Sequence, residues 1–356
     1  MLRKIHRYSA NKVIMNTINL EEVLSDNNID WKSFEESIIF VTGATGLIGS
    51  LLVKSLLEYK FRNKTNTKIL AFVRNLEKAK VMFGDNDVNF IVGDITTPIV
   101  IKEKIDFIFH CASVTTSKYM VTNPVETLHT SIGGTKNILE LAKKHSIKSM
   151  VYVSSMEVYG ITKDSDNPIT EEKLGHIDLT NVRSSYSEGK RICELICNSY
   201  HSEYGVNVKI ARLAMTFGPG VPSTDNRMPM QFAKSAISGK DIVLHTKGDS
   251  ISNFCYTTDA IRGLFIVLLK GKPGKAYNVC NDYETRAVKD IASLVAHEIA
   301  NDEIKVVFEI TESNVFGFAP KTEMRLNSNR LRSLGWKADI DMKSAFQNLI
   351  EYLKQI

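Results

Sequence analysis

The segment TGATGLIG (residues 42–49) decides the fold, because it joins an all-apolar run at 38–41 to a helical pattern at 47–57. Short all-apolar runs are typical of strands that are buried on both faces of a parallel sheet. After such a strand, Gly43 permits a tight turn, Gly46 lets the backbone approach a pyrophosphate, and Gly49 lets the helix pack closely on the strand. The N-terminus of the helix then offers N–H groups to the phosphates. The segment therefore predicts a dinucleotide-binding turn.

Strand and helix patterns alternate outward from this turn. Further buried-strand patterns lie at 69–73, 89–92, 107–110, 149–154 and 208–213, with helical patterns at 77–83, 123–144 and 186–204 between most of them. This alternation predicts an α/β fold of the Rossmann type, with a doubly wound parallel sheet. After the segment FGPG (217–220) the pattern is less regular and holds no nucleotide turn, which predicts a smaller mixed α/β substrate domain.

The chain is accordingly divided into three parts. Residues 1–36 form an N-terminal extension, which is expected either to pack on the main domain or to trail from it. Residues 37–217 form the NAD(P)-binding Rossmann domain, to which some later segments return. Residues 218–356 form mainly the substrate-binding domain.

Composition excludes several classes of protein. The 356 residues are 43% hydrophobic and 24% charged, and no apolar run approaches the ~18 residues that a membrane span needs. A net charge of +5 without a dense basic tract argues against nucleic-acid binding and suits an anionic small molecule. The five cysteines are an odd number. Cys193 and Cys197 could share a helix face as metal ligands, but no second pair has ligand spacing, which favours a reduced, cytoplasmic protein with no metal site.

Tyr186 and Lys190 are four residues apart, on one face of a predicted helix. An ammonium group beside a phenol stabilises the phenolate and lowers the tyrosine pKa, so that the tyrosine can take the proton of an alcohol while hydride leaves to a nicotinamide. Ser155 follows a buried strand, and at the carboxyl edge of the sheet it can hydrogen-bond the hydroxyl of a substrate. The second strand ends at Arg74, where NAD enzymes often carry an acidic residue. Arg74 therefore leaves NADP open as an alternative to NAD, unless it is simply exposed beside the adenine.

Together these segments resemble the extended short-chain dehydrogenase/reductase family, in particular its nucleotide-sugar epimerases, dehydratases and decarboxylases. The resemblance is carried by TGATGLIG (42–49), GDI (93–95), HCAS (110–113), SSMEVYG (154–160), RSSYSEGKR (183–191), FGPG (217–220), NFCYTTDA (253–260) and LGW (334–336). It implies NAD as the cofactor, a nucleoside diphosphate sugar as the substrate, and a place in the synthesis of cell-surface polysaccharide or glycan precursors. It also implies a homodimer, formed by the helices at 123–144 and 186–204.

The resemblance assigns roles to single residues. The catalytic residues would be Ser155, Glu157, Tyr186 and Lys190. The cofactor would contact Gly43, Thr45, Gly46, Leu47, Ile48, Gly49, Arg74, Asp94, Ile95, Cys111, Ala112, Ser113, Tyr186 and Lys190. The substrate would contact Thr115, Ser155, Met156, Met215 and Arg227, the last through its diphosphate.

The chemistry implied by the resemblance begins with oxidation at C4 of the hexose. The resulting 4-ketone leads to epimerisation at C4, to loss of the C6 hydroxyl, or to loss of CO₂ from a uronic acid. Dehydratases of the family carry an Asp-Glu pair where this chain has Met156-Glu157, which counts against standard dehydration. Glu157 and the segment at 183–191 also resemble the UDP-glucuronate decarboxylases, which are the main alternative.

Three departures from the family pattern bear on the substrate. Ser131 and Met215 stand where many relatives have Asn, or at 215 also Gln, and Ser252 stands where relatives have an arginine that contacts the diphosphate. Either the substrate differs or Arg325 and Arg330 compensate. Two other functions stay open: an NADP-dependent carbonyl or ketosugar reductase that uses the same residues, and a binding protein that has lost catalysis.

Overall fold

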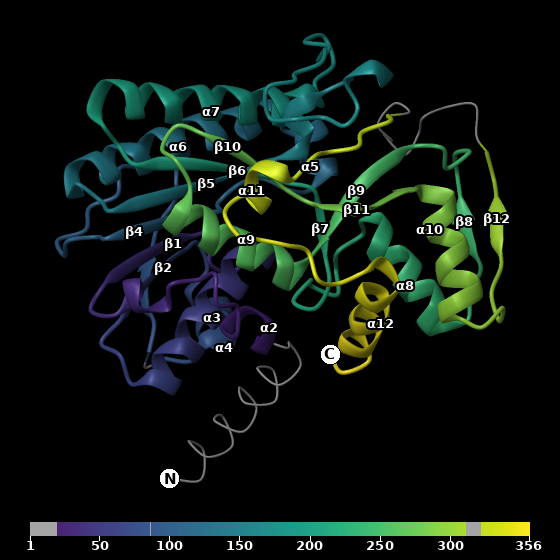
Figure 1. Cartoon of the computed structure of the whole chain (residues 1–356), viewed down its shortest axis with the longest axis horizontal. Coiled ribbons are helices and arrows are strands. Elements are labelled where there is room, and N and C mark those ends of the chain that lie inside the picture. The colour runs from purple at the N-terminus through teal and green to yellow at the C-terminus, as the bar shows by residue number, and fades with distance from the viewer. Residues whose placement is uncertain (1–19, 86, 311–321) are drawn as a thin grey trace.

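The computed structural model describes residues 20–85, 87–310 and 322–356. Seven parallel strands form the main sheet, in the order β10-β6-β5-β4-β1-β2-β3 (Figure 1). These strands are β1 (Ile38–Thr42), β2 (Lys68–Val73), β3 (Asn89–Val92), β4 (Phe107–His110), β5 (Ser149–Ser155), β6 (Val208–Leu213) and β10 (Ala276–Val279). The predicted doubly wound α/β fold is confirmed. The strand order reverses between β1 and β4, and open α/β sheets bind ligands at the carboxyl ends of the strands on either side of such a point.

Alternate strand residues point to opposite sides of the sheet, and both sets are apolar here, so helices cover both faces. Ile39 and Val41 belong to the core that is shared with α3 (Leu47–Asn63), α4 (Leu76–Phe83) and α9 (Thr257–Lys270). Phe40 belongs to the opposite core, which is shared with α6 (Pro124–His145) and α7 (Ser184–Tyr204). Figure 1 shows α6 and α7 lying together on that face. A short helix, α5 (Ser117–Thr122), precedes α6.

The later part of the chain builds two small sheets around a core of their own. One sheet pairs β7 (Met215–Phe217), β9 (Ile251–Tyr256) and β11 (Asn281–Ala287), and the other pairs β8 (Ile242–Leu244) with β12 (Val306–Phe308). Around them lie α8 (Met228–Ser238), α10 (Val288–Leu294), the π-helical turn η4 (Val295–Ile299) and α12 (Met342–Leu353) (Figure 1). A short helix, α11 (Asn329–Arg332), packs near β10.

The described part of the N-terminal extension packs on the Rossmann core. It contains α2 (Glu21–Leu24) and the 3₁₀ helix η1 (Trp31–Phe34), and it buries Val23, Trp31 and Phe34 in the core under α3 and α9. Residues 1–19 of the extension lie outside the described residues.

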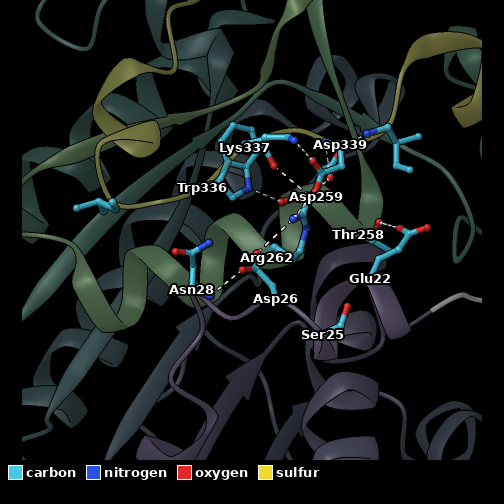
Figure 2. Close-up of polar contacts among 12 residues, drawn as sticks. Glu22, Ser25, Asp26, Asn28, Thr258, Asp259, Arg262, Trp336, Lys337 and Asp339 are labelled. Carbon is cyan, nitrogen blue, oxygen red and sulfur yellow. Dashed lines mark hydrogen bonds and ion pairs between the residues drawn. The ribbon is translucent and has the colours of Figure 1, made fainter.

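An ion pair and a hydrogen bond fasten the extension to α9 (Figure 2). Arg262 is buried on α9, and it pairs with Asp26 of the extension at 3.2 Å, with Asp259 one turn earlier, and with Asp339 at 2.7 Å. Glu22 accepts a hydrogen bond from the Thr258 hydroxyl. The extension is therefore held by charge as well as by apolar packing. Among the helices of the described residues, none is long and apolar enough to cross a bilayer.

Candidate active site

The glycine turn between β1 and α3 leaves no room for side chains. Gly43 has φ +63°, which favours glycine, and a Cβ there would lie 2.8 Å from the Ala112 backbone nitrogen. A Cβ on Gly49 would overlap the Gly43 carbonyl oxygen, because the first turn of α3 rests directly on this loop. Gly46 is exposed at the N-cap of α3. The turn thus presents bare backbone and a helix N-terminus, which suits a pyrophosphate.

Three further residues of this segment line the start of the helix. Leu47 and Ile48 are half-buried and pack against the core under α3, and Thr45 is half-buried in the turn itself. Their positions beside the glycine turn are those that the sequence predicts for residues near a cofactor.

Thr42 fixes the neighbouring loop after β4. Its Oγ1 accepts hydrogen bonds from the backbone N–H groups of Cys111 and Ala112, both at 3.1 Å, and lies 2.8 Å from His110 Nδ1. Burial lowers the pKa of His110 to about 3, so the ring is neutral and Nδ1 can accept the Thr42 proton. These contacts of Thr42 hold loop 111–113 against the glycine turn. Thr42 and His110 were not predicted as site residues, although they begin the segments TGATGLIG and HCAS.

The loop residues that were predicted as cofactor contacts directly follow His110 at the end of β4. Cys111, Ala112 and Ser113 are half-buried. Burial raises the pKa of the Cys111 thiol to about 12, so the thiol is uncharged at neutral pH. Thr115 follows and is exposed.

Asp94 and Ile95 lie beyond the end of β3, with Arg74 nearby. The exposed Asp94 carboxylate accepts hydrogen bonds from the Thr96 hydroxyl (2.7 Å) and backbone N–H (2.9 Å). These bonds, helped by the charge of Arg74, lower the pKa of Asp94. Ile95 is buried against Gly134 of α6, where a Cβ would lie 2.9 Å from it. The end of β3 is thus followed by the exposed carboxylate of Asp94 and the buried apolar side chain of Ile95. Arg74 is also exposed.

Ser155, Tyr186 and Lys190 meet at the carboxyl end of β5. Ser155 is the last residue of this strand, and its side chain acts on the Tyr186 phenol in the direction that lowers the phenol pKa. Lys190 is buried, donates to the Val153 carbonyl oxygen at 2.7 Å, and lies 5.8 Å from the centroid of the Tyr186 ring. The i, i+4 spacing on α7 therefore brings the two side chains to one face, and β5 supplies the serine.

The predicted lowering of the Tyr186 pKa is wrong for the chain without its cofactor. Burial raises the pKa to about 12, and the negative charge of Glu157 adds to the rise. The hydrogen bond from Ser155 and the charges of Arg183 and Arg227 work in the opposite direction. Burial wins because the side chain is only 8% exposed.

Glu157 is held beside the tyrosine by two partners. Its carboxylate accepts from Arg183 at 2.9 Å and from the Ser187 hydroxyl at 3.1 Å. Arg183 also lies over the Tyr186 ring, 5.7 Å from its centroid. The Glu157 carboxylate is therefore held in place by two hydrogen bonds, and its charge acts on Tyr186. Ser187 was missed as a partner, and only its place one residue after Tyr186 hinted at it.

Ser252, one of the departures from the family pattern, contacts Met156. Met156 follows Ser155 directly, and its sulfur accepts a hydrogen bond from the Ser252 hydroxyl at 3.8 Å. Met215 is the register partner of Phe254, two residues after Ser252 on β9, so Met215 and Ser252 lie on one face of that sheet. These uncharged side chains replace the polar and charged groups that the resemblance leads one to expect.

Arg227 approaches the same region from the start of α8. Its guanidinium pairs with Asp225 at 2.8 Å and donates to the Thr216 carbonyl oxygen at 3.1 Å, while its charge acts on Tyr186. The side chain stays 39% exposed, so it has room for an anionic ligand. Arg325 pairs with Glu323 and is 46% exposed, and Arg330 pairs with Glu171 and Glu172.

The residues fit a nicotinamide dinucleotide. Glycines 43, 46 and 49 leave the backbone cradle that a pyrophosphate requires, and the Tyr186–Lys190 pair stands at the carboxyl edge of the same sheet. The site therefore has a turn that suits a dinucleotide and a buried tyrosine–lysine pair at the same edge of the sheet.

Comparison with known proteins agrees with this geometry. The model of the NAD dependent epimerase/dehydratase family matches residues 39–280. UDP-glucuronic acid decarboxylase 6 of Arabidopsis thaliana is 32% identical over 311 residues, which are 83% of this chain and 88% of the relative. dTDP-D-glucose 4,6-dehydratase of Homo sapiens is 25% identical over 331 residues, 89% of this chain and 90% of the relative.

Solved structures show the same fold. The UDP-glucose 4-epimerase of Thermotoga maritima, solved with UDP-glucose, superposes with a TM-score of 0.75 at 19% sequence identity, over 89% of this chain and 99% of that one. A dTDP-glucose 4,6-dehydratase of Streptomyces venezuelae, solved with NAD, gives a TM-score of 0.72 at 19% identity, over 89% and 97% of the two chains.

Proposed function

The chain belongs to the NAD-dependent epimerase/dehydratase family, and on that premise we propose that it converts a nucleoside diphosphate sugar through transient oxidation at C4. The observation that carries this proposal is the meeting of Ser155, Tyr186 and Lys190 beside the glycine turn. The pathway would be the synthesis of cell-surface polysaccharide or glycan precursors.

The residues divide the work as follows. Tyr186 takes the proton of the sugar O4, Ser155 orients that oxygen by a hydrogen bond, and Lys190 holds the cofactor ribose and stabilises the phenolate. NAD⁺ held by the glycine turn and Lys190 would supply the hydride acceptor and donor for C4, and its positive charge would favour the phenolate form of Tyr186. Arg227 binds the diphosphate by charge-assisted hydrogen bonds.

We propose epimerase or dehydratase chemistry as the broad class. Within it, epimerisation is favoured over standard dehydration, because Met156 has no acidic group to protonate a leaving C6 hydroxyl and its sulfur is engaged by Ser252. Residues 37–217 would bind NAD, with NADP as the alternative while Arg74 stands exposed at the end of β2, and residues 218–356 would bind mainly the sugar nucleotide.

A UDP-glucuronate decarboxylase is the second candidate. The Glu157–Arg183 pair beside Tyr186 favours it, as does the 32% identity with the Arabidopsis decarboxylase. A carbonyl reductase that uses the same residues is the third candidate, and it would consume reduced cofactor for every product molecule.

A panel of UDP-, dTDP-, GDP- and CDP-sugars, followed by mass spectrometry and chromatography, tests the proposal. Unchanged mass with a new sugar indicates epimerisation, loss of water indicates dehydration, and loss of CO₂ indicates decarboxylation. Failure to convert any nucleotide sugar, with turnover of free ketones at the expense of NADPH, would overturn it.

Replacing Glu157 by Gln is expected to move the pH dependence of the reaction. Because the Glu157 charge raises the pKa of Tyr186, its removal lowers that pKa, and the acidic limb of the kcat/KM profile shifts to lower pH. Glu188→Gln is the matched control, since Glu188 pairs with Arg191 on the same helix at 3.0 Å. A limb that stays in place, or moves to higher pH, contradicts the proposed electrostatic link.

We also propose a homodimer that buries the outer faces of α6 and α7. Val125 on α6 is 71% exposed, and Ile192 and Leu195, one turn apart on α7, are 38% and 66% exposed. Leu195→Glu places a charge in this apolar face and is expected to weaken the dimer by about a hundredfold, as measured by sedimentation. Val81→Glu, at a 72% exposed position on α4, is the control. Equal dimer fractions in both variants would place the interface elsewhere.

A further inference from the structure

A buried ion pair joins the helix of Tyr186 to β6, the strand next to β5 in the main sheet. Arg212 of β6 and Glu194 of α7 have side chains that are only 7% and 9% exposed. Arg212 Nη2 lies 2.6 Å from Glu194 Oε2, and Nε lies 3.0 Å from Oε1, so the contact is a bidentate fork. Burial would lower the pKa of Arg212, but the hydrogen bonds and charge of Glu194 outweigh it and raise the pKa, so the arginine stays charged.

The same carboxylate also holds the end of β5. Ser154 donates from its hydroxyl to Glu194 Oε1 at 2.5 Å, and Ser154 is the register partner of Arg212. Ser155, whose side chain acts to lower the pKa of the Tyr186 phenol, is the next residue. Glu194 lies one turn after Lys190 and two turns after Tyr186 on α7. One carboxylate therefore connects the strand that carries the serine with the helix that carries the tyrosine.

Arg212 extends the connection to the turn after β5. Its Nη1 donates to the Tyr159 hydroxyl at 3.0 Å and to the Glu171 carbonyl oxygen at 2.9 Å. Tyr159 ends the 3₁₀ helix η2 (Met156–Tyr159), which contains Met156 and Glu157, and its hydroxyl donates to Asn278 Oδ1 at 2.6 Å. All these partners are satisfied within the described residues, so the network is fixed on β5, η2, α7, β6 and β10.

Stability alone is a weak reason for such a pair. Apolar residues of similar volume often replace a buried ion pair without loss of stability, whereas the fork fixes distance and direction as apolar contacts do not. We propose that the Arg212–Glu194 pair, with Ser154, is a positioning device that holds the Tyr186 phenol against the Ser155 hydroxyl. This inference rests on the proposed function, in which these two groups handle the proton of the sugar.

Ser154→Ala and Arg212→Lys test the proposal by steady-state kinetics across pH. Ser154→Ala removes the bond from β5 to Glu194 but leaves the ion pair, and Arg212→Lys keeps the charge but loses the fork. We expect kcat to fall by about tenfold and about a hundredfold respectively, with KM and NAD affinity within about twofold of the wild type. Because the Ser155 hydrogen bond lowers the Tyr186 pKa, loosening it should also move the acidic limb of the pH profile to higher pH.

Two controls separate positioning from simple loss of stability. Ser149→Ala removes a buried hydroxyl bond of 2.6 Å at the far end of the same strand, and Arg262→Lys changes a buried arginine with carboxylate partners on α9 (Figure 2). Ser149→Ala should lower the melting temperature as much as Ser154→Ala does, and Arg262→Lys as much as Arg212→Lys does. In both controls kcat per folded molecule and the acidic limb of the pH profile should stay unchanged.

The outcomes are distinct for the two proposals. A wild-type enzyme that converts no nucleotide sugar refutes the proposed function. An active wild type with the same pH limb and the same kcat per folded molecule in Ser154→Ala and Arg212→Lys refutes the positioning role alone. If Arg212→Lys does not fold, the comparison of kcat and the pH limb between Ser154→Ala and its control Ser149→Ala decides the positioning role.

Discussion

Tyr186→Phe is expected to lower kcat by about a thousandfold while NAD stays bound, since a positioned general base contributes roughly a hundred- to ten-thousandfold to proton transfer. The variant removes only the hydroxyl that would take the O4 proton. The ring, which is buried on α7 with Lys190 5.8 Å from its centroid, stays in place. Turnover of the substrate found in the panel, measured together with the NAD content of the purified protein, checks this expectation.

The control for Tyr186→Phe lies on the same helix. Tyr200→Phe removes a hydroxyl that hydrogen-bonds Glu140 at 2.5 Å, three turns further along α7 than Lys190. It should leave kcat within about twofold of the wild type. Full activity in Tyr186→Phe would mean that another group takes the proton, and the assignment of the base would be wrong.

Gly49→Ala is expected to raise the NAD dissociation constant by at least about a hundredfold, which is about 2.8 kcal/mol of binding free energy. A Cβ at this position would overlap the Gly43 carbonyl oxygen, so the turn that approaches the pyrophosphate must move. Isothermal titration of the cofactor-free protein with NAD⁺ measures the effect.

Gly133→Ala is the matched control for this prediction. Gly133 is also in a helix, α6, but a Cβ there would lie 3.5 Å from the His129 ring, an ordinary contact. Alanine favours helix over glycine by about 1 kcal/mol, so this variant should be at least as stable as the wild type and should bind NAD normally. Equal NAD affinity in both variants would show that the turn does not carry the cofactor.

Much of the Rossmann part could be predicted because its signals are local. β3, β4 and β6 have the bounds that the sequence patterns indicate, since these runs are short and sharply bounded. The i, i+4 spacing of Tyr186 and Lys190 likewise places the pair on one face of α7. β7, β9, β11 and β12 were not predicted as strands. β11, for example, reads NDYETRA, and its pairing depends on β9 rather than on any apolar alternation of its own.

The parts of the site that could not be predicted depend on distant contacts. Met156 and Ser252 are 96 residues apart in the chain, and only the fold reveals that they touch. The direction of the Tyr186 pKa was mispredicted for a related reason. A nearby ammonium is visible in the sequence, whereas the burial that raises the pKa is set by the packing of the whole site.

Transfer of a deuterium label tests the central claim most directly. The substrate found in the panel is prepared with deuterium at C4 and incubated with the enzyme in ordinary water, and the product is examined by NMR and mass spectrometry. Transient oxidation at C4 predicts that the deuterium remains in the sugar product and that no net NADH is consumed. Release of the deuterium into water, or consumption of one reduced cofactor for each product molecule, would contradict it.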